Sequence, residues 1–132
     1  MWSFNKKKKK DVKPNIIWLD ETDSTNNYLK NYIPASDEKI SVVVADYQKA
    51  GRGQGANTWE SEPGENLLFS ILVHPVMVPV HCQFLLSMAE ALALKEVLDN
   101  YTEGITLKWP NDIYWNDKKI GGTLIETTLG GG

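Results

Sequence analysis

The order of apolar and polar positions along the chain predicts a mixture of strands and helices. Apolar, β-branched runs bounded by Pro, Gly, Asn or Asp are typical of strands, and apolar residues at three- and four-residue steps after Ser, Asp or Pro are typical of helices. We therefore expect strands over residues 14–20, 40–45, 66–73 and 105–109, a hairpin of residues 113–115 and 119 to about 127, and helices over residues 25–31 and 79–100.

The longer predicted helix is expected to bury one face. Pro79 suits the first helical position, and about five turns follow, ending near Asn100. We expect one apolar set to lie in the core and one charged set to face solvent: Phe84, Leu85, Met88, Leu92 and Leu98 inside, and Glu90, Lys95, Glu96 and Asp99 outside.

Strands interrupted by two helices predict an α+β fold, with a sheet that has helices on one side. Residues 46–65 lose any period and are expected to form a long loop. The run 40–45 is apolar on both sides, as in a strand buried on both faces. The last hairpin strand is expected at or near a sheet edge, and no second domain or repeat is evident.

Composition narrows the class of protein. The chain has 132 residues, 42% of them hydrophobic, with one Cys and two His. This is enough for one compact domain, and Cys82 has no partner for an internal disulfide, which fits a reducing compartment. No apolar run is long enough to span a membrane, and we expect a cytoplasmic protein. The two histidines, His74 and His81, lie near Cys82, but the chain offers them no fourth ligand, so incidental packing is favoured over a metal site.

Charge is divided unevenly along the chain. The formal net charge is −3, but six lysines lie within residues 1–13, a segment expected to be a disordered tail. From Pro14 onward, eight basic residues face sixteen acidic ones, a balance of −8. An acidic body argues against a nucleic-acid surface. The only arginine, Arg52, lies in a glycine-rich segment.

That segment fits no standard nucleotide motif. Gly51, Gly53 and Ala56 match GxGxxG/A after a strand, but no helix follows, so a Rossmann site is excluded, and no Walker motif is present. Glycines still let a backbone approach a ligand, and Arg52 between two of them suits a carboxylate or phosphate. A surface loop with a solvated arginine is the alternative.

Two further segments are candidates for chemistry. Lys108 ends an apolar strand before Trp109 and Pro110, where it either meets an anion in a cleft or points to solvent from an edge strand. The segment 24–26, Ser-Thr-Asn, stands at a helix start, where a simple cap is the more common role.

Taken together and in order, these motifs resemble the bacterial biotin–protein ligases. The match extends over about residues 15–127. The motifs that carry it are Ser24-Thr25-Asn26, Gln48 with Gly51-Arg52-Gly53, Trp59, Lys108-Trp109-Pro110-Asn111-Asp112, and Ile120-Gly121-Gly122 continuing to Glu126.

The resemblance implies a fold and a reaction. The fold would be a mixed β-sheet backed by helices, similar to class II aminoacyl-tRNA synthetases, with residues 14–132 forming the N-terminal portion of the catalytic domain. The reaction would join biotin and ATP into biotinyl-5′-AMP, with Mg²⁺ on the phosphates. The biotinyl group would then pass to a lysine of a biotin carboxyl carrier domain of a biotin-dependent carboxylase. The alternatives are a non-catalytic biotin-binding fragment and a lipoate–protein ligase.

The resemblance also implies roles for individual residues. Arg52 and Lys108 would be the catalytic cations. Biotin would be bound by Ser24, Thr25, Asn26, Gln48, Gly51, Arg52, Gly53, Gln54 and Lys108. The nucleotide would be bound by Arg52, Gln54, Asn57, Trp59, Lys108 and Asn111. Asp112 is the candidate metal ligand.

Two positions depart from the usual family pattern. Gln54 lowers the positive charge of the loop where arginine is common, which would let the adenylate leave more readily. Ala56 stands where glycine is common, which affects the loop geometry.

We expect no N-terminal DNA-binding domain, because only thirteen residues precede the first strand. The oligomeric state stays open, with a homodimer as one option.

Overall fold

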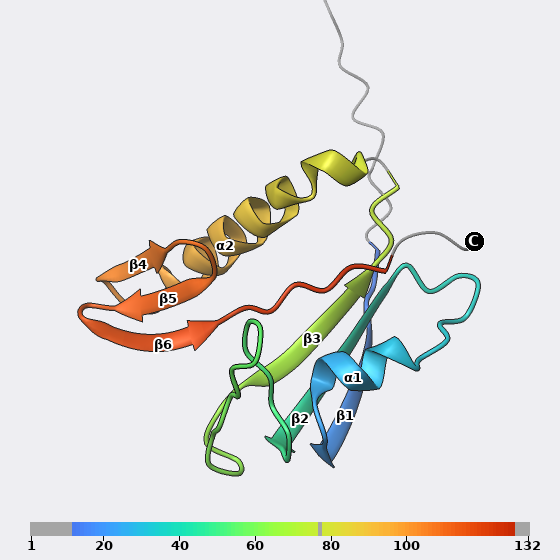
Figure 1. Ribbon diagram of the computed structural model, residues 1–132, viewed down its shortest axis with the longest axis horizontal. Coiled ribbons are helices and arrows are strands. Elements are labelled where there is room, and N and C mark those ends of the chain that lie inside the picture. The colour runs from blue at the N-terminus through green and yellow to red at the C-terminus, as the bar shows by residue number, and fades with distance from the viewer. Residues whose placement is uncertain (1–11, 77, 129–132) are drawn as a thin grey trace, which may run out of the picture. The chain divides into compact units, whose positions relative to one another are not determined.

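The computed structural model describes residues 12–76 and 78–128, and these form two compact units (Figure 1). The first unit comprises the described residues up to Ala50 together with Glu60–His74, and the second comprises Gly51–Trp59 together with the described residues from Pro75 onward. Most of the predicted tail lies outside the described residues, so its expected disorder stays a prediction.

The first unit is built on a three-stranded mixed sheet. Strand β2 (Ile40–Gln48) lies in the middle, parallel to β1 (Asn15–Thr22) and antiparallel to β3 (Leu68–Val73). The predicted burial of this strand on both faces is found on one face only: Ser41, Val43 and Ala45 are buried, whereas Ile40, Val42 and Val44 on the other face are partly exposed. Val43 and Ala45 are almost fully buried there, which places the core of this unit on β2.

Helix α1 (Thr25–Lys30) packs on β2 and β3, across one face of this sheet (Figure 1). Ser24 is its N-cap, and the Ser24 Oγ accepts a hydrogen bond of 3.0 Å from the backbone N–H of Asn27. The side chain of Leu29, a residue of this helix, is buried. The predicted short helix is confirmed, and its first residues, Thr25 and Asn26, contact Gln48 at the end of β2 and Ser70 on β3.

The second unit pairs a long helix with an antiparallel meander. A single 3₁₀ turn, η1 (Val80–Cys82), precedes helix α2 (Phe84–Leu98), which packs on β4. The strands lie in the order β4-β5-β6, with bounds Ile105–Lys108, Asp112–Trp115 and Lys118–Gly122. Asn116 takes a φ of 54° in the tight turn between β5 and β6, a conformation that asparagine tolerates better than most residues. The predicted hairpin and the edge position of its last strand are confirmed.

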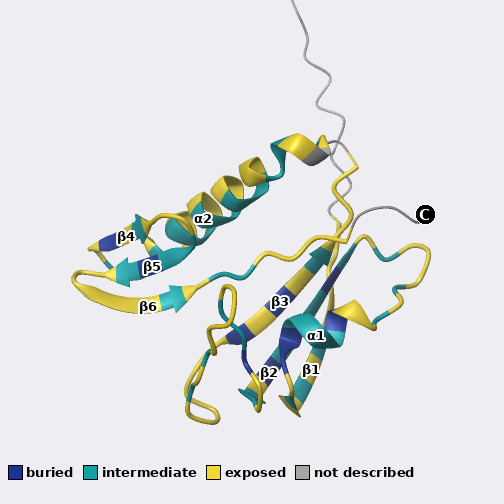
Figure 2. Cartoon of the chain, in the orientation of Figure 1, coloured by how far each residue is buried: buried dark blue, intermediate teal, exposed yellow. Residues whose placement is uncertain are grey.

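The predicted inner face of α2 is wrong at four of its five positions, and Leu98 alone is partly buried as predicted. Phe84, Leu85, Met88 and Leu92 are 45–60% exposed, whereas Glu90 is half-buried and accepts a hydrogen bond. Figure 2 shows one side of this helix as intermediate and the other as exposed. The helix is apolar on more than one side, since Leu86, Ala91 and Leu94 lie on its less exposed side. Periodicity alone therefore could not choose between the two faces.

Several predicted boundaries also differ from the structure, three of them for a clear reason. Helix α2 starts at Phe84 rather than Pro79, because the first turn is 3₁₀. Strand β2 continues into the predicted loop as far as Gln48, since β1 pairs with it that far. The last strand ends at Gly122 rather than near Thr127, where the ladder to β5 stops. The α+β fold class is confirmed. No helix among the described residues has the length and apolar character to cross a bilayer.

Candidate functional site

A buried polar cluster lies where α1 meets the sheet of the first unit. Gln48 Oε1 accepts hydrogen bonds from the Thr25 backbone N–H at 2.8 Å and from the Thr25 hydroxyl at 3.1 Å. The Thr25 Oγ1 also lies 2.6 Å from the Ser70 Oγ, and Ser70 donates to Asn26 Oδ1. Ser24, Thr25 and Ser70 are all buried. The predicted residues Ser24, Thr25, Asn26 and Gln48 are thus brought together.

The Gln48 amide has a fixed orientation in this cluster. A backbone N–H can only donate, so the atom facing Thr25 is the amide oxygen. The amide nitrogen, with its two N–H groups, makes no hydrogen bond to another described residue. Gln48 therefore offers two donors to a ligand with an acceptor atom.

Ser70 belongs to this cluster, although the sequence analysis did not single it out. Its signal was a hydroxyl within the apolar run of β3, at a buried position. A buried hydroxyl requires partners, and Ser70 finds them in Thr25 and Asn26. A polar residue inside an otherwise apolar strand could have identified it.

The glycine-rich segment of the second unit forms a tight closed turn. Arg52 and Thr58 are bridged in antiparallel fashion, Gly53 N–H donates to the Asn57 carbonyl at 2.8 Å, and Trp59 N–H donates to the Gly51 carbonyl at 2.8 Å. A side chain at Gly53 would place its Cβ 3.1 Å from the Asn57 Cβ. Gln54 and Asn57 are exposed at the tip. The turn is ordered by its own backbone, without a following helix.

The Arg52 side chain extends from this turn and forms a bidentate ion pair with Glu126. Arg52 Nη2 lies 2.5 Å from Glu126 Oε1, and Nη1 lies 3.3 Å from Oε2. The two side chains are about one third exposed. The hydrogen bonds to Glu126 raise the pKa of the Arg52 guanidinium above its ordinary value, against the effect of burial. Geometry of this kind is the preferred way for arginine to bind a carboxylate.

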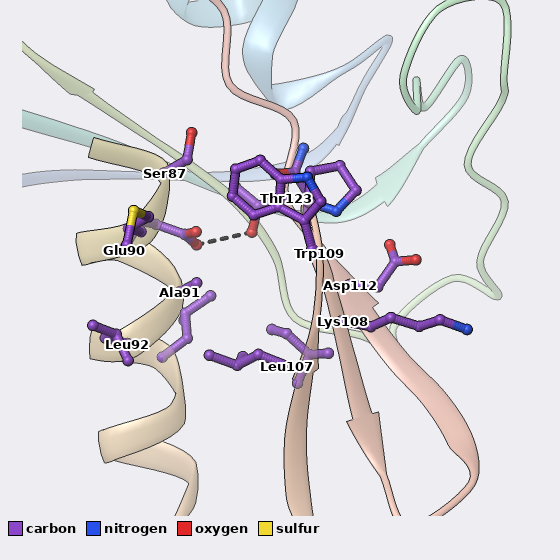
Figure 3. Close-up of a pocket in the computed structure, with 14 residues that line it drawn as sticks. Ser87, Glu90, Ala91, Leu92, Leu107, Lys108, Trp109, Asp112 and Thr123 are labelled. Carbon is purple, nitrogen blue, oxygen red and sulfur yellow. Dashed lines mark hydrogen bonds between the residues drawn. The ribbon is translucent and has the colours of Figure 1, made fainter. Parts of the chain in front are cut away.

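Lys108 ends β4, an edge strand, and its side chain is exposed. Its Nζ lies 5.3 Å from the centre of the Tyr114 ring, within cation–π range. In Figure 3 the Lys108 side chain extends away from α2. No hydrogen bond or ion pair with another described residue engages this ammonium, which leaves its donors accessible to an anion.

Trp59, Asp112 and Lys119 gather around Gly122. Lys119 Nζ lies 3.1 Å from Asp112 Oδ1 and 5.3 Å from the centre of the Trp59 ring. A Cβ at Gly122 would lie 3.4 Å from the Trp59 ring, so a side chain there would press on the indole. The half-exposed ring of Trp59 and the Asp112–Lys119 pair thus form one surface beside the glycine turn.

A cavity of about 260 Å³ lies between α2 and the β4–β5 strands (Figure 3). Its lining is mostly apolar, and two of its polar lining residues, Glu90 and Thr123, share a hydrogen bond of 2.8 Å. Asn111 lines the same cavity, and its carbonyl accepts a hydrogen bond of 3.0 Å from the Thr123 N–H. Burial raises the pKa of the Glu90 carboxyl above its ordinary value, while the hydrogen bond from Thr123 opposes this effect.

The described residues do not fit a metal ion held by the protein alone. No group of three or more His, Cys, Asp or Glu side chains that could hold a metal occurs among them. Asp112, the candidate ligand, is paired with Lys119, whose ammonium competes with a cation for the carboxylate. Mg²⁺ carried on ATP phosphates needs few protein ligands, and it stays a prediction.

The candidate residues therefore form two sets, each within one unit. Ser24, Thr25, Asn26 and Gln48 belong to the first unit, whereas the second unit carries Gly51, Arg52, Gly53, Gln54, Asn57, Trp59, Lys108, Asn111 and Asp112. The first set offers neutral hydrogen-bonding groups. The second offers cations and an aromatic ring, which suit an anionic ligand.

Comparisons with known proteins agree with the motifs. The model of the biotin/lipoate A/B protein ligase family matches residues 18–132. The bifunctional ligase/repressor BirA of Salmonella typhimurium is 36% identical over 115 residues, covering 86% of this chain and 35% of that protein. The chain thus spans about a third of the length of this relative.

Solved structures of biotin protein ligases share the fold. The enzyme from Leishmania major, in complex with biotinyl-5-AMP, has a TM-score of 0.67 at 33% identity, over 86% of this chain and 52% of that one. The enzyme from Aquifex aeolicus, in complex with biotin and ATP, has a TM-score of 0.64 at 35% identity, over 86% of this chain and 47% of that one. The resemblance in the motifs is confirmed, and the chain belongs to the biotin/lipoate A/B protein ligase family.

Proposed function

We propose that the chain provides part of an ATP-dependent biotin–protein ligase. The carboxylate oxygen of biotin attacks the α-phosphorus of ATP, the bond to the β-phosphate breaks, and pyrophosphate leaves. A carrier lysine then attacks the acyl carbon of biotinyl-5′-AMP, AMP leaves, and the amine loses a proton. The observation that carries the proposal is the Arg52–Glu126 pair, since the guanidinium already binds a carboxylate through both Nη atoms.

Charge explains why two cations suit this reaction. The biotin carboxylate and the α-phosphate are both anionic, and like charges about 4 Å apart repel by about 4 kcal/mol at an effective dielectric of 20. Fixed cations offset that repulsion and stabilise the charge that grows at phosphorus. Arg52 and Lys108 are the proposed cations: Arg52 is held in an ordered turn, and Lys108 presents an exposed ammonium.

The polar cluster of the first unit suits the other end of biotin. The ureido ring has two N–H donors and one carbonyl acceptor. The Gln48 amide nitrogen offers donors for the carbonyl, and the hydroxyl and amide oxygens of Ser24, Thr25 and Asn26 offer acceptors for the ring N–H groups. Because the cluster is buried and bonded internally, it would meet the ring with little loss of side-chain freedom.

The remaining candidates fit the nucleotide half. The half-exposed Trp59 ring offers a stacking surface for adenine, and Gln54 and Asn57 lie at the exposed tip of the same turn. Asn111 follows Lys108 in the turn after β4. Gly51 and Gly53 let the backbone of the turn come close to the ligand. We propose the carrier domain as the protein partner, with a cytoplasmic location.

The direct test is transfer. The chain is incubated with biotin, ATP and a biotin carboxyl carrier domain, and the carrier is weighed by mass spectrometry. The proposal expects the mass of the carrier to increase by one biotinyl group on one lysine. When ATP is omitted, the mass of the carrier should not increase. A parallel reaction with lipoic acid separates the two substrates of the family.

Two other outcomes would contradict the proposal. Biotin binding by calorimetry without any adenylate formation would indicate a binding fragment rather than a ligase. Modification of a carrier with lipoic acid but not with biotin would assign the chain to lipoate transfer. Each result identifies a different function, so the experiment decides among all three.

A further inference from the structure

Thr123 connects two elements of the second unit. Its hydroxyl donates to Glu90 Oε1 on α2 at 2.8 Å, and its backbone N–H donates to the Asn111 carbonyl at 3.0 Å. One residue after β6 therefore ties the helix to the turn that follows β4. Figure 3 shows Glu90 and Thr123 facing each other, while the Lys108 side chain extends away from α2.

The tied turn carries candidate ligand-binding residues. Lys108 and Asp112 are partners in the register of β4 and β5, so residues 109–111 form the connection between them. Trp109, the first residue of this connection, is 72% exposed. The bond from Thr123 to the Asn111 carbonyl is a fixed anchor at its far end.

Glu90 is the residue of α2 that bonds to Thr123, and a glutamate is unusual at this position. A carboxyl group that is half-buried in an apolar cavity loses hydration, which is unfavourable. Its hydrogen bond from Thr123 offsets part of that free-energy cost. Burial raises its pKa, so the position is unfavourable for the charged form. Glu96, on the exposed side of the same helix, has no such constraint. A role for Glu90 in holding Thr123 accounts for an acid at this place.

We propose that Glu90, acting through Thr123, is a positioning residue that holds the Asn111 turn in place for nucleotide recognition. The inference rests on the proposed function and deepens its nucleotide half. In this proposal Glu90 acts only through its contact with Thr123. Its effect reaches the substrate through the Thr123 hydroxyl, the Thr123 backbone and the Asn111 carbonyl.

The test uses Thr123→Val, which removes the hydroxyl and keeps the shape, together with Glu90→Ala and Glu90→Gln. Hydrogen exchange of the residue-123 amide reports the anchor directly, and biotin-dependent exchange of pyrophosphate into ATP reports KM and kcat. Thr123→Val and Glu90→Ala are expected to lose protection at residue 123 and to raise the KM for ATP about three- to tenfold. The KM for biotin is expected to change by less than about twofold. Glu90→Gln keeps an acceptor and is expected to stay close to the unmutated chain.

Glu96→Ala is the matched control, because it removes a carboxyl from the exposed side of α2. Unchanged protection at residue 123 in Thr123→Val would overturn the proposal, and so would lost protection with an unchanged KM for ATP. Equal increases in both KM values would also contradict it, since they indicate general loosening of the unit. If the unmutated chain exchanges no pyrophosphate, the proposed function and the nucleotide role built on it both fail, whereas the amide measurement still reports whether the anchor exists.

Discussion

Arg52 and Glu126 lie 74 positions apart in the sequence, and Arg52 Nη2 reaches within 2.5 Å of Glu126 Oε1. The pair joins the glycine turn to the segment after β6 within the second unit. Its geometry occupies the same N–H groups that a substrate carboxylate or phosphate would use. A bound anion must therefore either replace the Glu126 carboxylate or share the guanidinium with it.

Arg52→Ala is expected to weaken the binding of biotin and of a biotinyl-adenylate analogue. The loss of a charge-assisted contact corresponds to roughly 1.5–3 kcal/mol, which calorimetry would measure as a higher Kd. Lys49→Ala is the matched control, because Lys49 is an exposed cation that pairs with Glu21 at 3.2 Å. An unchanged Kd in Arg52→Ala would remove this arginine from the site.

Glu126→Gln is expected to strengthen binding of the same adenylate analogue. The substitution keeps the side-chain shape but removes the negative charge that competes for Arg52. Since partly exposed ion pairs contribute up to about 1 kcal/mol, the Kd should fall by roughly two- to fivefold. Glu103→Gln gives the same change of charge at an exposed position of the same unit. Weaker binding in Glu126→Gln would show instead that the carboxylate is needed to orient the guanidinium.

Ser70→Ala tests the polar cluster of the first unit. The change deprives the Thr25 hydroxyl and the Asn26 amide oxygen of a buried partner, which should lower the free energy of unfolding by about 1–3 kcal/mol. Urea unfolding gives that value, and calorimetry gives the accompanying loss of biotin affinity. Ser36→Ala, at an exposed position, is the control. If the Ser70→Ala variant is destabilised but binds biotin with full affinity, the polar cluster does not take part in biotin binding.

Glu38 gives a prediction for the pH dependence of stability. The hydrogen bond from Ser41 Oγ, at 2.6 Å, is the main cause that lowers the pKa of this carboxyl, and Asn15 and Tyr32 also donate to it. A lowered pKa in the folded state favours folding above the ordinary pKa of glutamate, about 4.3, and this contribution is lost as pH falls through the folded value.

Glu38→Gln should therefore be less stable than the unmutated chain at pH 7, with a difference that shrinks as the pH falls below about 4. Thermal unfolding at several pH values measures the effect. Glu65→Gln, at an exposed position of the same unit, is the control. A stability difference that stays constant across this range would show that ionisation of Glu38 contributes nothing.

Local signals predicted most of the secondary structure. The Ser24 cap and the Asn116 turn each depend on a few adjacent residues, and both occur as expected. The buried face of α2 could not be predicted in this way, because the helix is apolar on more than one side. Only the packing against β4 distinguishes Glu90 from the exposed acids of the same helix.

In the candidate site too, some residues could be predicted from local sequence and others could not. Motifs identified Thr25, Gln48 and Arg52, since residue type and spacing carry that information. Their partners Ser70 and Glu126 lie 45 and 74 positions away from Thr25 and Arg52. Pairings over such distances depend on strand register and chain path, which no local pattern encodes. Glu126 was part of a matching motif, but its contact with Arg52 emerged only from the fold.

Biotin-dependent exchange of labelled pyrophosphate into ATP tests most directly whether fixed cations drive adenylate formation. The exchange rate is compared between the unmutated chain, Lys108→Ala and Lys118→Ala. Lys118 is an exposed lysine on β6 and serves as the matched control. The account predicts that Lys108→Ala exchanges at least about 10²-fold more slowly, with unfolding unchanged, while Lys118→Ala exchanges at the normal rate. An unmutated rate in Lys108→Ala would contradict the account.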